Sequence, residues 1–282
     1  MKLSELKQVL SENNIRTKKR LDQHFLYDSS ILKREVEYAG VTELDTILEI
    51  GPGIGTLTEK ILEKTENVTV IELDQSFRKI LEKLNIQIVI ADALKVDWEK
   101  LFQEYETPKF NKIISNVPYS ISSPLIFKIL KYAPELAVLC LQKEFAERMV
   151  AQPGTKNYSR LSVNCSVRAD VELVEQIPKE EYYPIPKVDS AIVRITPKPN
   201  AQRPTPNTLE KFDSIVRAAF QHKNQKLKKA LMHSWKEFGA KQGRGEGATK
   251  EDVQKFVDKL GEIGERKVFE ISADEFVKIS KL

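Results

Sequence analysis

The stretch Thr46-Ile-Leu-Glu-Ile-Gly-Pro-Gly-Ile-Gly55 joins a short apolar run to a turn rich in glycine, and a helical pattern follows from Thr56 to Lys64. A strand that leads through glycines into a helix is typical of the first unit of a nucleotide-binding α/β sheet, because glycine lets a ligand approach the backbone. Dinucleotide dehydrogenases share this turn. It therefore predicts a fold and a nucleotide-like ligand, but does not identify the ligand.

Strands and helices continue to alternate beyond this turn. A helical pattern covers residues 76–84, and apolar runs predict strands at 67–71, 86–90, 112–115 and 136–141. This alternation predicts an α/β fold with a Rossmann-like, doubly wound and mostly parallel sheet. Residues 169–177 and 188–195 alternate apolar and polar side chains, and we expect them to close the sheet as antiparallel strands.

The chain is predicted to form two domains. Residues 197–206 contain prolines that break regular structure repeatedly, as a linker does. We expect a catalytic domain at 1–198, which begins with a basic segment at 1–28, and a small helical domain at 205–282. The helices predicted in the second domain cover 209–220, 225–238, 250–260 and 273–279, and the glycine-rich residues 242–247 are predicted to form a mobile loop.

Composition excludes several classes of protein. Of the 282 residues, 41% are hydrophobic and 30% are charged, which is ordinary for a soluble protein and not for a disordered one. No apolar run is long enough to span a membrane, and the N-terminus has an amphipathic pattern without the apolar block of a signal peptide. We therefore expect a cytoplasmic protein. Cys140 is expected to be a small buried hydrophobic residue. Since neither the two cysteines nor the three histidines have the spacing of metal ligands, no metal is expected.

Positive charge is concentrated in two places. One cluster consists of Arg16, Lys18, Lys19 and Arg20, and the other consists of Arg217, Lys223, Lys226, Lys228 and Lys229, with no acid among residues 217–229. Solvated helix faces also look like this. Two such clusters in one chain nevertheless favour binding to the phosphate backbone of a nucleic acid.

Acidic residues follow the second and third predicted strands. Gly51 and Gly53 lie in the first turn, Glu72 ends the second strand, and Asp92 follows the third. An acid in the position of Glu72 commonly accepts hydrogen bonds from ribose hydroxyls, and Asp92 could accept one from an adenine amine. Together with Glu49 and a polar motif after the fourth strand, this pattern favours S-adenosylmethionine over NAD.

That polar motif is Asn116-Val-Pro-Tyr119. The Asn116 side-chain carbonyl and the backbone carbonyl of Val117, bent outward before Pro118, can each accept an N–H of an exocyclic base amine. Tyr119 offers a flat face for stacking. Asn and Pro are also common in solvent-exposed turns. The position of the motif in a nucleotide-type sheet nevertheless favours a pocket for a nucleobase.

From Lys18 to about residue 219, the chain resembles the ribosomal RNA adenine N6,N6-dimethyltransferase family, with weaker similarity beyond. The matching motifs include the glycine turn, the Asn116 motif and the following segments in the family's order: Gln23-His-Phe-Leu26, Ile71-Glu-Leu-Asp74, Asp92-Ala93, Gln142-Lys-Glu144, Tyr158-Ser-Arg-Leu-Ser-Val163, Tyr182-Tyr-Pro-Ile-Pro-Lys-Val-Asp-Ser190 and Phe220-Gln-His-Lys-Asn224. The chain departs from the family's pattern at three positions: Val117 replaces the more usual Leu, Ser159 replaces a common Gly, and Tyr182 replaces the usual Phe. The hydroxyl of Tyr182 needs a partner if it is buried.

The resemblance implies a function and a set of site residues. The implied activity is S-adenosylmethionine-dependent dimethylation of adenine N6 on two adjacent adenosines, in a loop near the 3′ end of small-subunit ribosomal RNA, by a monomer that acts during subunit biogenesis. Implied cofactor contacts are His24, Leu26, Gly51, Gly53, Glu72, Asp92 and Asn116. Residues expected at the target base are Asn116, Val117, Pro118, Tyr119 and Tyr182. Residues expected to bind RNA are Lys18, Lys19, Arg20, Lys187, Lys223, Lys226, Lys228 and Lys229.

Two other functions stay open from the sequence. The chain could be a non-catalytic ribosome-assembly or transcription factor on the same fold, although such a factor has no need to keep Asn116 and Tyr119. It could also be a DNA adenine N6-methyltransferase with the same tetrapeptide. The segment Tyr182–Ser190 and the basic helical C-terminus argue against DNA as the substrate.

Overall fold

The computed structural model describes residues 1–105, 109–238 and 249–282, and the chain forms two compact units. The first contains Met1–Ala146 and Val171–Pro197, and the second contains Glu147–Asp170 and Lys198–Leu282. The division predicted from sequence, 1–198 and 205–282, differs at residues 147–170, because Tyr158, Val163 and Val167 pack into the core of the second unit. The predicted loop at 242–247 lies outside the described residues.

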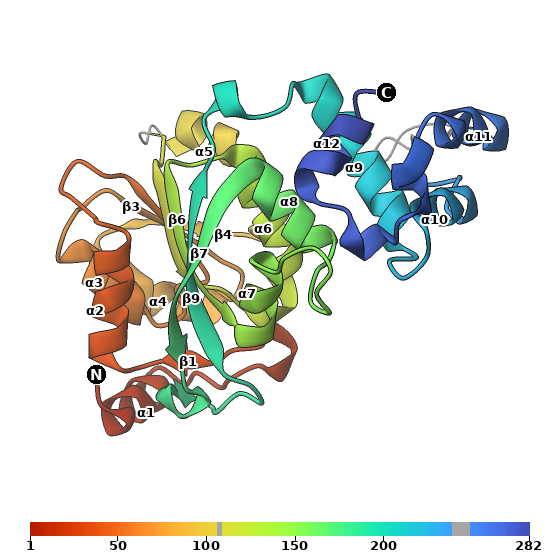
Figure 1. The fold of residues 1–282 in the computed structure, drawn as a ribbon. Coiled ribbons are helices and arrows are strands. Elements are labelled where there is room, and N and C mark those ends of the chain that lie inside the picture. Colours follow the sequence, from red (N-terminus) through yellow and green to blue (C-terminus); the bar gives the residue numbers. More distant parts are fainter. Residues whose placement is uncertain (106–108, 239–248) are drawn as a thin grey trace. The chain divides into compact units, whose positions relative to one another are not determined.

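A seven-stranded sheet forms the centre of the first unit (Figure 1). Its strand order is β4-β3-β2-β5-β6-β9-β7, with bounds β4 (Gln87–Ile90), β3 (Val68–Glu72), β2 (Ile47–Ile50), β5 (Lys112–Asn116), β6 (Leu136–Gln142), β9 (Ser190–Pro197) and β7 (Ala169–Ile177). Neighbouring strands from β4 to β6 are parallel, and β9 is antiparallel to β6. The doubly wound, mostly parallel fold is confirmed, and each predicted strand is present with bounds shifted by at most two residues.

Helices cover both faces of this sheet. One core cluster joins Val70 and Ile114 of the sheet to buried residues of α1 (Leu3–Glu12), α2 (Ser29–Tyr38), α3 (Thr56–Leu62) and α4 (Arg78–Leu81). Figure 1 shows α2 and α3 on one side of the sheet, and α6 (Ser122–Tyr132) on the other. The helix α5 (Trp98–Tyr105) lies between β4 and β5 in the chain. The predicted helix at 76–84 is α-helical only in α4, with short 3₁₀ turns on either side.

The carboxyl ends of β2, β3, β4 and β5 meet at one edge of the sheet because these strands are parallel. One of these strands ends at, or within two residues before, each of the residues Gly51, Glu72, Asp92 and Asn116. A short two-stranded ribbon, β1 (Phe25–Leu26) with β8 (Tyr182–Tyr183), is antiparallel and pairs Leu26 with Tyr182. The sheet topology thus gathers residues from distant parts of the sequence.

The second unit is helical and has its own core, which includes Phe212, Leu231 and Phe276. Its helices are α8 (Arg160–Arg168), α9 (Pro206–Phe220), α10 (Leu227–His233), α11 (Lys250–Asp258) and α12 (Ala273–Ile279), and α7 (Lys143–Met149) crosses the boundary between the units. The prediction of one helix over 225–238 was wrong. Lys226 has an extended backbone and is bridged to Lys267, so α10 begins only at Leu227.

Within the described ranges, every helix is too short or too polar to cross a membrane.

Candidate active site

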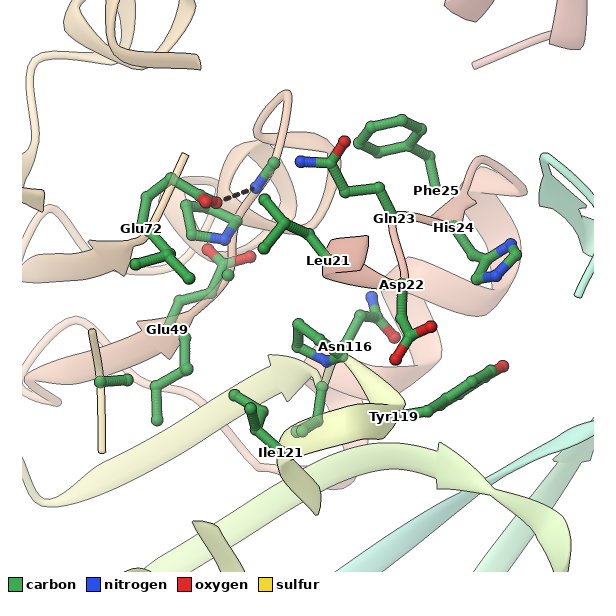
Figure 2. A pocket seen from close by; sticks show the side chains of 18 of the residues that line it. Leu21, Asp22, Gln23, His24, Phe25, Glu49, Glu72, Asn116, Tyr119 and Ile121 are labelled. Atoms are coloured by element: carbon green, nitrogen blue, oxygen red, sulfur yellow. Dashed lines mark hydrogen bonds between the residues drawn. The ribbon is translucent and has the colours of Figure 1, made fainter. Parts of the chain in front are cut away.

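A pocket of about 310 Å³ opens at the carboxyl ends of the central strands (Figure 2). Its lining contains every residue predicted for the cofactor or the target base: His24, Leu26, Gly51, Gly53, Glu72, Asp92, Asn116, Val117, Pro118, Tyr119 and Tyr182. Figure 2 shows Glu49 and Glu72 on one side, the rings of His24 and Tyr119 on the other, and Asn116 between them. The structure thus brings these residues together, while their individual roles remain predictions.

The glycine turn packs directly against other parts of the pocket. Gly51 and Gly53 have φ angles of 70° and 58°, which L side chains rarely adopt. A Cβ on Gly53 would lie 2.9 Å from the Phe25 ring, and one on Gly51 would lie 3.4 Å from Pro118. The turn therefore needs glycine for its conformation, and at Gly53 also for space.

Glu72 lies at the end of β3 with only 6% of its surface exposed. The Gly53 N–H donates to Oε2 at 3.1 Å, drawn as a dashed line in Figure 2, and the Asp74 N–H donates to Oε1 at 2.7 Å. Burial raises the pKa of this carboxyl, although the two backbone donors oppose that shift. Each oxygen has a second lone pair for another donor, so Glu72 can accept hydrogen bonds from two ribose hydroxyls.

Asp92 lies in a turn that a lysine holds in place. The Leu94 N–H donates to Asp92 Oδ1 at 2.9 Å. Lys128 of α6 donates to the carbonyls of Ala93, at 2.7 Å, and Leu94, at 3.3 Å, and also to that of Val96. Sequence reasoning missed Lys128, because no motif links it to residues more than thirty positions earlier.

Asn116 is the last residue of β5, and its side chain has two different environments. Its Nδ2 donates to Oε2 of Glu35 at 3.2 Å. Its Oδ1 is buried and has no hydrogen-bond partner in the described part of the chain. The next backbone N–H, of Val117, donates to the Cys140 carbonyl at 3.1 Å. The motif is thereby fixed to the sheet and leaves one strong acceptor unused at the pocket.

The aromatic residues of the pocket are held by polar contacts. The rings of His24 and Tyr119 are stacked, with centroids 6.0 Å apart, and the Tyr119 hydroxyl is 2.7 Å from Ser190 Oγ. His24 Nδ1 donates to the Pro184 carbonyl at 2.6 Å. Tyr182 is 4% exposed, and its hydroxyl has the partner that its burial requires, Cys140 Sγ at 3.0 Å. Cys140 is buried, as predicted.

The basic N-terminal segment contacts the pocket region. Lys18 forms an ion pair with Asp74 at 2.6 Å, and Gln23 also donates to Asp74. Burial opposes the ionised form of Asp74, but these donors hold its pKa at about 2. Asp22 accepts from the Ser120 N–H at 3.1 Å, directly beyond the Asn116 motif. Arg20 is exposed at the pocket. The segment thus fastens both to the end of β3 and to the turn after β5.

The remaining residues predicted to bind RNA lie on the surface. Lys187 is exposed in the first unit. In the second unit, Lys226 forms an ion pair with Glu265 at 2.9 Å, and Lys228 pairs with the same carboxylate. Lys223 donates to the Lys156 carbonyl at 2.9 Å, and Lys229 is exposed. The side chain of Lys19 lies outside what the structure describes.

The electrostatics of the pocket suit a cationic ligand. Its lining contains the acids Asp22, Glu49, Glu72 and Asp92, against the single arginine Arg20. Burial raises the pKa of Glu49 to about 8, even though Thr58 donates a hydrogen bond to it, so Glu49 is mostly protonated near neutral pH and the negative charge of the lining comes from the other acids. A sulfonium is attracted to such a lining, whereas the pyrophosphate of a dinucleotide is repelled. Within the described ranges, the pocket included, no group of three or more His, Cys, Asp or Glu side chains could hold a metal ion.

Comparisons with known proteins agree with this geometry. A family model described as ribosomal RNA adenine dimethylase matches residues 14–254. A protein of Thermococcus sibiricus named "Probable ribosomal RNA small subunit methyltransferase A" is 40% identical over 279 residues, which cover 97% of this chain and 94% of the relative. A protein of the same name from Methanopyrus kandleri is 45% identical over 236 residues, which cover 80% of this chain and 81% of the relative.

Two solved structures are similar over most of their length. A dimethyladenosine transferase from Plasmodium falciparum superposes with a TM-score of 0.71 at 29% identity, covering 90% of this chain and 95% of that one. The 23S rRNA methyltransferase ErmE superposes with a TM-score of 0.61 at 26% identity, covering 91% of this chain and 98% of that one.

Proposed function

The chain belongs to the ribosomal RNA adenine dimethylase family, and from that premise we propose that it dimethylates N6 of two adjacent adenosines in a loop near the 3′ end of small-subunit ribosomal RNA. The enzyme is an S-adenosylmethionine-dependent RNA methyltransferase. We further propose that the enzyme is monomeric and cytoplasmic, and that it acts on a precursor of the small subunit during ribosome biogenesis. The small-subunit names of the relatives from Thermococcus sibiricus and Methanopyrus kandleri support this choice of particle.

The observation that carries this proposal is the unpartnered Oδ1 of Asn116 at the pocket. A buried acceptor without a partner costs free energy, so a ligand that brings a donor binds there favourably. The exocyclic amine of adenine is such a donor. His24 and Tyr119, stacked on one side of Asn116, offer aromatic surface for the base ring. To reach this pocket the adenine must leave its stack, which costs a few kcal/mol and least in a single-stranded loop.

The residues present fit S-adenosylmethionine on the other side of Asn116. Glu72 has lone pairs free for the ribose hydroxyls, Asp92 is available for the adenine amine, and the acidic lining suits the sulfonium. When bound, S-adenosylmethionine supplies an electrophilic methyl group. The chain's own contribution is to orient the base: Asn116 Oδ1 and the Val117 carbonyl hold the amine hydrogens. The rate enhancement then comes mainly from positioning, since the amine can lose its proton after the transfer.

Tritiated methyl transfer to under-methylated small subunits, followed by nucleoside analysis, tests this function. We expect N6,N6-dimethyladenosine at two adjacent positions near the 3′ end. Large subunits, the source of 23S rRNA, serve as the control substrate and should accept little label. Label confined to the large subunit, or to DNA, would refute the proposed substrate.

The Asn116→Ala variant tests the pocket itself. Removing a preorganised acceptor from a dry site costs on the order of 3 kcal/mol, or about 10²-fold in rate. We therefore expect nearly complete loss of methyl transfer in a protein that still folds. Activity within a few-fold of wild type would show that Asn116 does not bind the target amine.

A further inference from the structure

A buried glutamate lies directly behind Asn116 and has no role in the function proposed so far. Glu35 is on α2, and only 1% of its surface is exposed. Burial raises its pKa well above the ordinary value, and Glu49, the second cause, raises it further. A carboxyl group in such a place costs free energy that an aliphatic side chain would not. Its contacts therefore call for an explanation beyond packing.

The only hydrogen bond that Glu35 makes to a side chain in the described part of the chain is the one it accepts from Asn116 Nδ2, at 3.2 Å. Glu35 Oε1 is buried and unpartnered, as is Asn116 Oδ1. The Glu35 carboxyl therefore binds the NH₂ group of the Asn116 amide. The opposite end of that amide, its oxygen, is left for the pocket.

The orientation of this amide decides whether it can bind an amine. A side-chain amide has a donor end and an acceptor end of nearly equal shape. If the Asn116 amide turned over, its NH₂ group would meet the NH₂ group of the target adenine, and two donors cannot form a hydrogen bond. Its oxygen would then face Glu35 Oε2. The backbone cannot select between the two orientations, because β5 fixes only the main chain of Asn116.

We propose that Glu35 is a positioning residue, which holds the Asn116 amide with its oxygen toward the target amine. This inference rests on the proposed function for its link to methyl transfer, but its structural part concerns Glu35 and Asn116 alone. Glu35 acts through Asn116 and does not touch the substrate. A carboxyl oxygen can accept the Asn116 hydrogen bond in either protonation state, but only the ionised carboxylate, which has no O–H to donate, excludes the reversed amide.

Substitutions at position 35 separate this role from packing. Glu35→Leu keeps approximate volume and removes the acceptor, so we expect kcat to fall about 10- to 100-fold, the range for loss of one positioned hydrogen bond, with the Kd for S-adenosylmethionine unchanged. Glu35→Gln keeps an acceptor for Asn116 and should restore kcat to within about threefold of wild type. Val36→Ala is the matched control, because Val36 is equally buried on the same helix and packs in the apolar core. It should lower thermal stability without lowering kcat.

Two kinetic results would overturn the proposal. One is a Glu35→Leu enzyme whose kcat falls no further than that of Val36→Ala, since Glu35 would then be only a packing residue. The other is a Glu35→Gln enzyme as slow as Glu35→Leu, because that result would show that the acceptor is not what matters.

A measurement without RNA keeps this inference separate from the proposed function. In protein labelled with ¹⁵N-asparagine, the Asn116 side-chain signal is assigned by its absence from Asn116→Ala. We expect its N–H groups to be protected from hydrogen exchange in wild type and Glu35→Gln, and unprotected in Glu35→Leu. Equal exchange in all three refutes the role of Glu35 whatever the substrate is. Protection as expected, without methylation of small subunits, refutes only the proposed function.

Discussion

At the scale of single residues, the pocket consists of polar groups whose hydrogen-bonding capacity the protein uses only in part. Glu72 accepts one backbone N–H on each oxygen and keeps further lone pairs, while Asn116 keeps its whole carbonyl oxygen. Such groups are costly in an empty pocket and become favourable when a ligand supplies the missing partners. This explains why buried acids and an amide, rather than apolar residues, line the carboxyl ends of these strands.

Glu72→Ala should weaken binding of S-adenosylmethionine and leave RNA binding unchanged. Hydrogen bonds to a charged group contribute about 1.5–3 kcal/mol, so we expect a Kd about 10- to 100-fold higher. Calorimetry with each ligand separately measures both affinities. Glu66→Ala, which removes an exposed acid just before β3, is the control and should change neither. A large loss of RNA affinity at unchanged cofactor affinity would contradict the assignment of Glu72.

Glu49 should make folding stability depend on pH. Burial raises its pKa to about 8 from an ordinary value of 4.5. Between these values the folded protein holds a proton that the unfolded chain has lost, so the contribution of Glu49 is fully present below the lower value and is lost as pH rises to about 8. Glu49→Gln stays neutral and can still accept the Thr58 hydrogen bond. Its stability relative to wild type should therefore increase with pH.

Urea unfolding of wild type and Glu49→Gln at about pH 6 and about pH 9 measures this difference. The comparison cancels the titration of groups that both proteins share, such as Asp74. A stability difference that is independent of pH would show that Glu49 titrates in the folded protein as it does in the unfolded chain.

At the scale of elements, the sequence predicted strands better than contacts between them. Apolar runs identified β2 to β6, since most of these residues are buried in the sheet, and the alternation of apolar and polar residues identified β7 and β9. The same parallel order explains why Gly51, Glu72, Asp92 and Asn116 could be placed in one pocket from the sequence. Helix α10 could not be bounded in this way, because its start depends on pairing with Lys267, forty residues away. The partners Lys18–Asp74 and Glu35–Asn116 are 56 and 81 residues apart in sequence, so no local pattern connects them.

The turn after β4 provides a prediction about one such contact between elements. Lys128 of α6 donates to three carbonyls of the turn that carries Asp92, and lies 4.6 Å from the Trp98 ring centroid. Lys128→Met should loosen this turn and weaken S-adenosylmethionine binding about tenfold, which corresponds to about 1.4 kcal/mol. Lys131→Met, on the same helix but exposed, should have no effect. Equal cofactor affinity in both variants, measured by calorimetry, would show that the turn keeps its shape without Lys128.

At the scale of the whole molecule, the predicted active-site residues and the C-terminal lysine cluster lie in different compact units. Every predicted residue of the cofactor and base pocket lies in the first unit, and the lysines between residues 223 and 229 lie in the second. The structure adds that Glu265 neutralises part of this lysine cluster, through Lys226 and Lys228. Exposed ion pairs of this kind contribute little to stability, so an RNA phosphate can displace Glu265 at little cost.

The lysine cluster should bind ribosomal RNA phosphates without shaping the pocket. Replacing Lys223, Lys226 and Lys229 by Gln should weaken binding to small subunits. It should also reduce the slope of log affinity against log salt concentration, because fewer counterions are released on binding. The expected reduction is about 0.7–0.9 for each phosphate that the variant no longer neutralises. Affinity for S-adenosylmethionine should stay unchanged. The control replaces the exposed Lys250, Lys255 and Lys259, which removes equal charge from the same unit around α11. If both triple variants lose affinity equally, the enzyme recognises net charge and not this surface. If neither loses affinity, the cluster is a solvated helix face, and RNA binding belongs to the first unit alone.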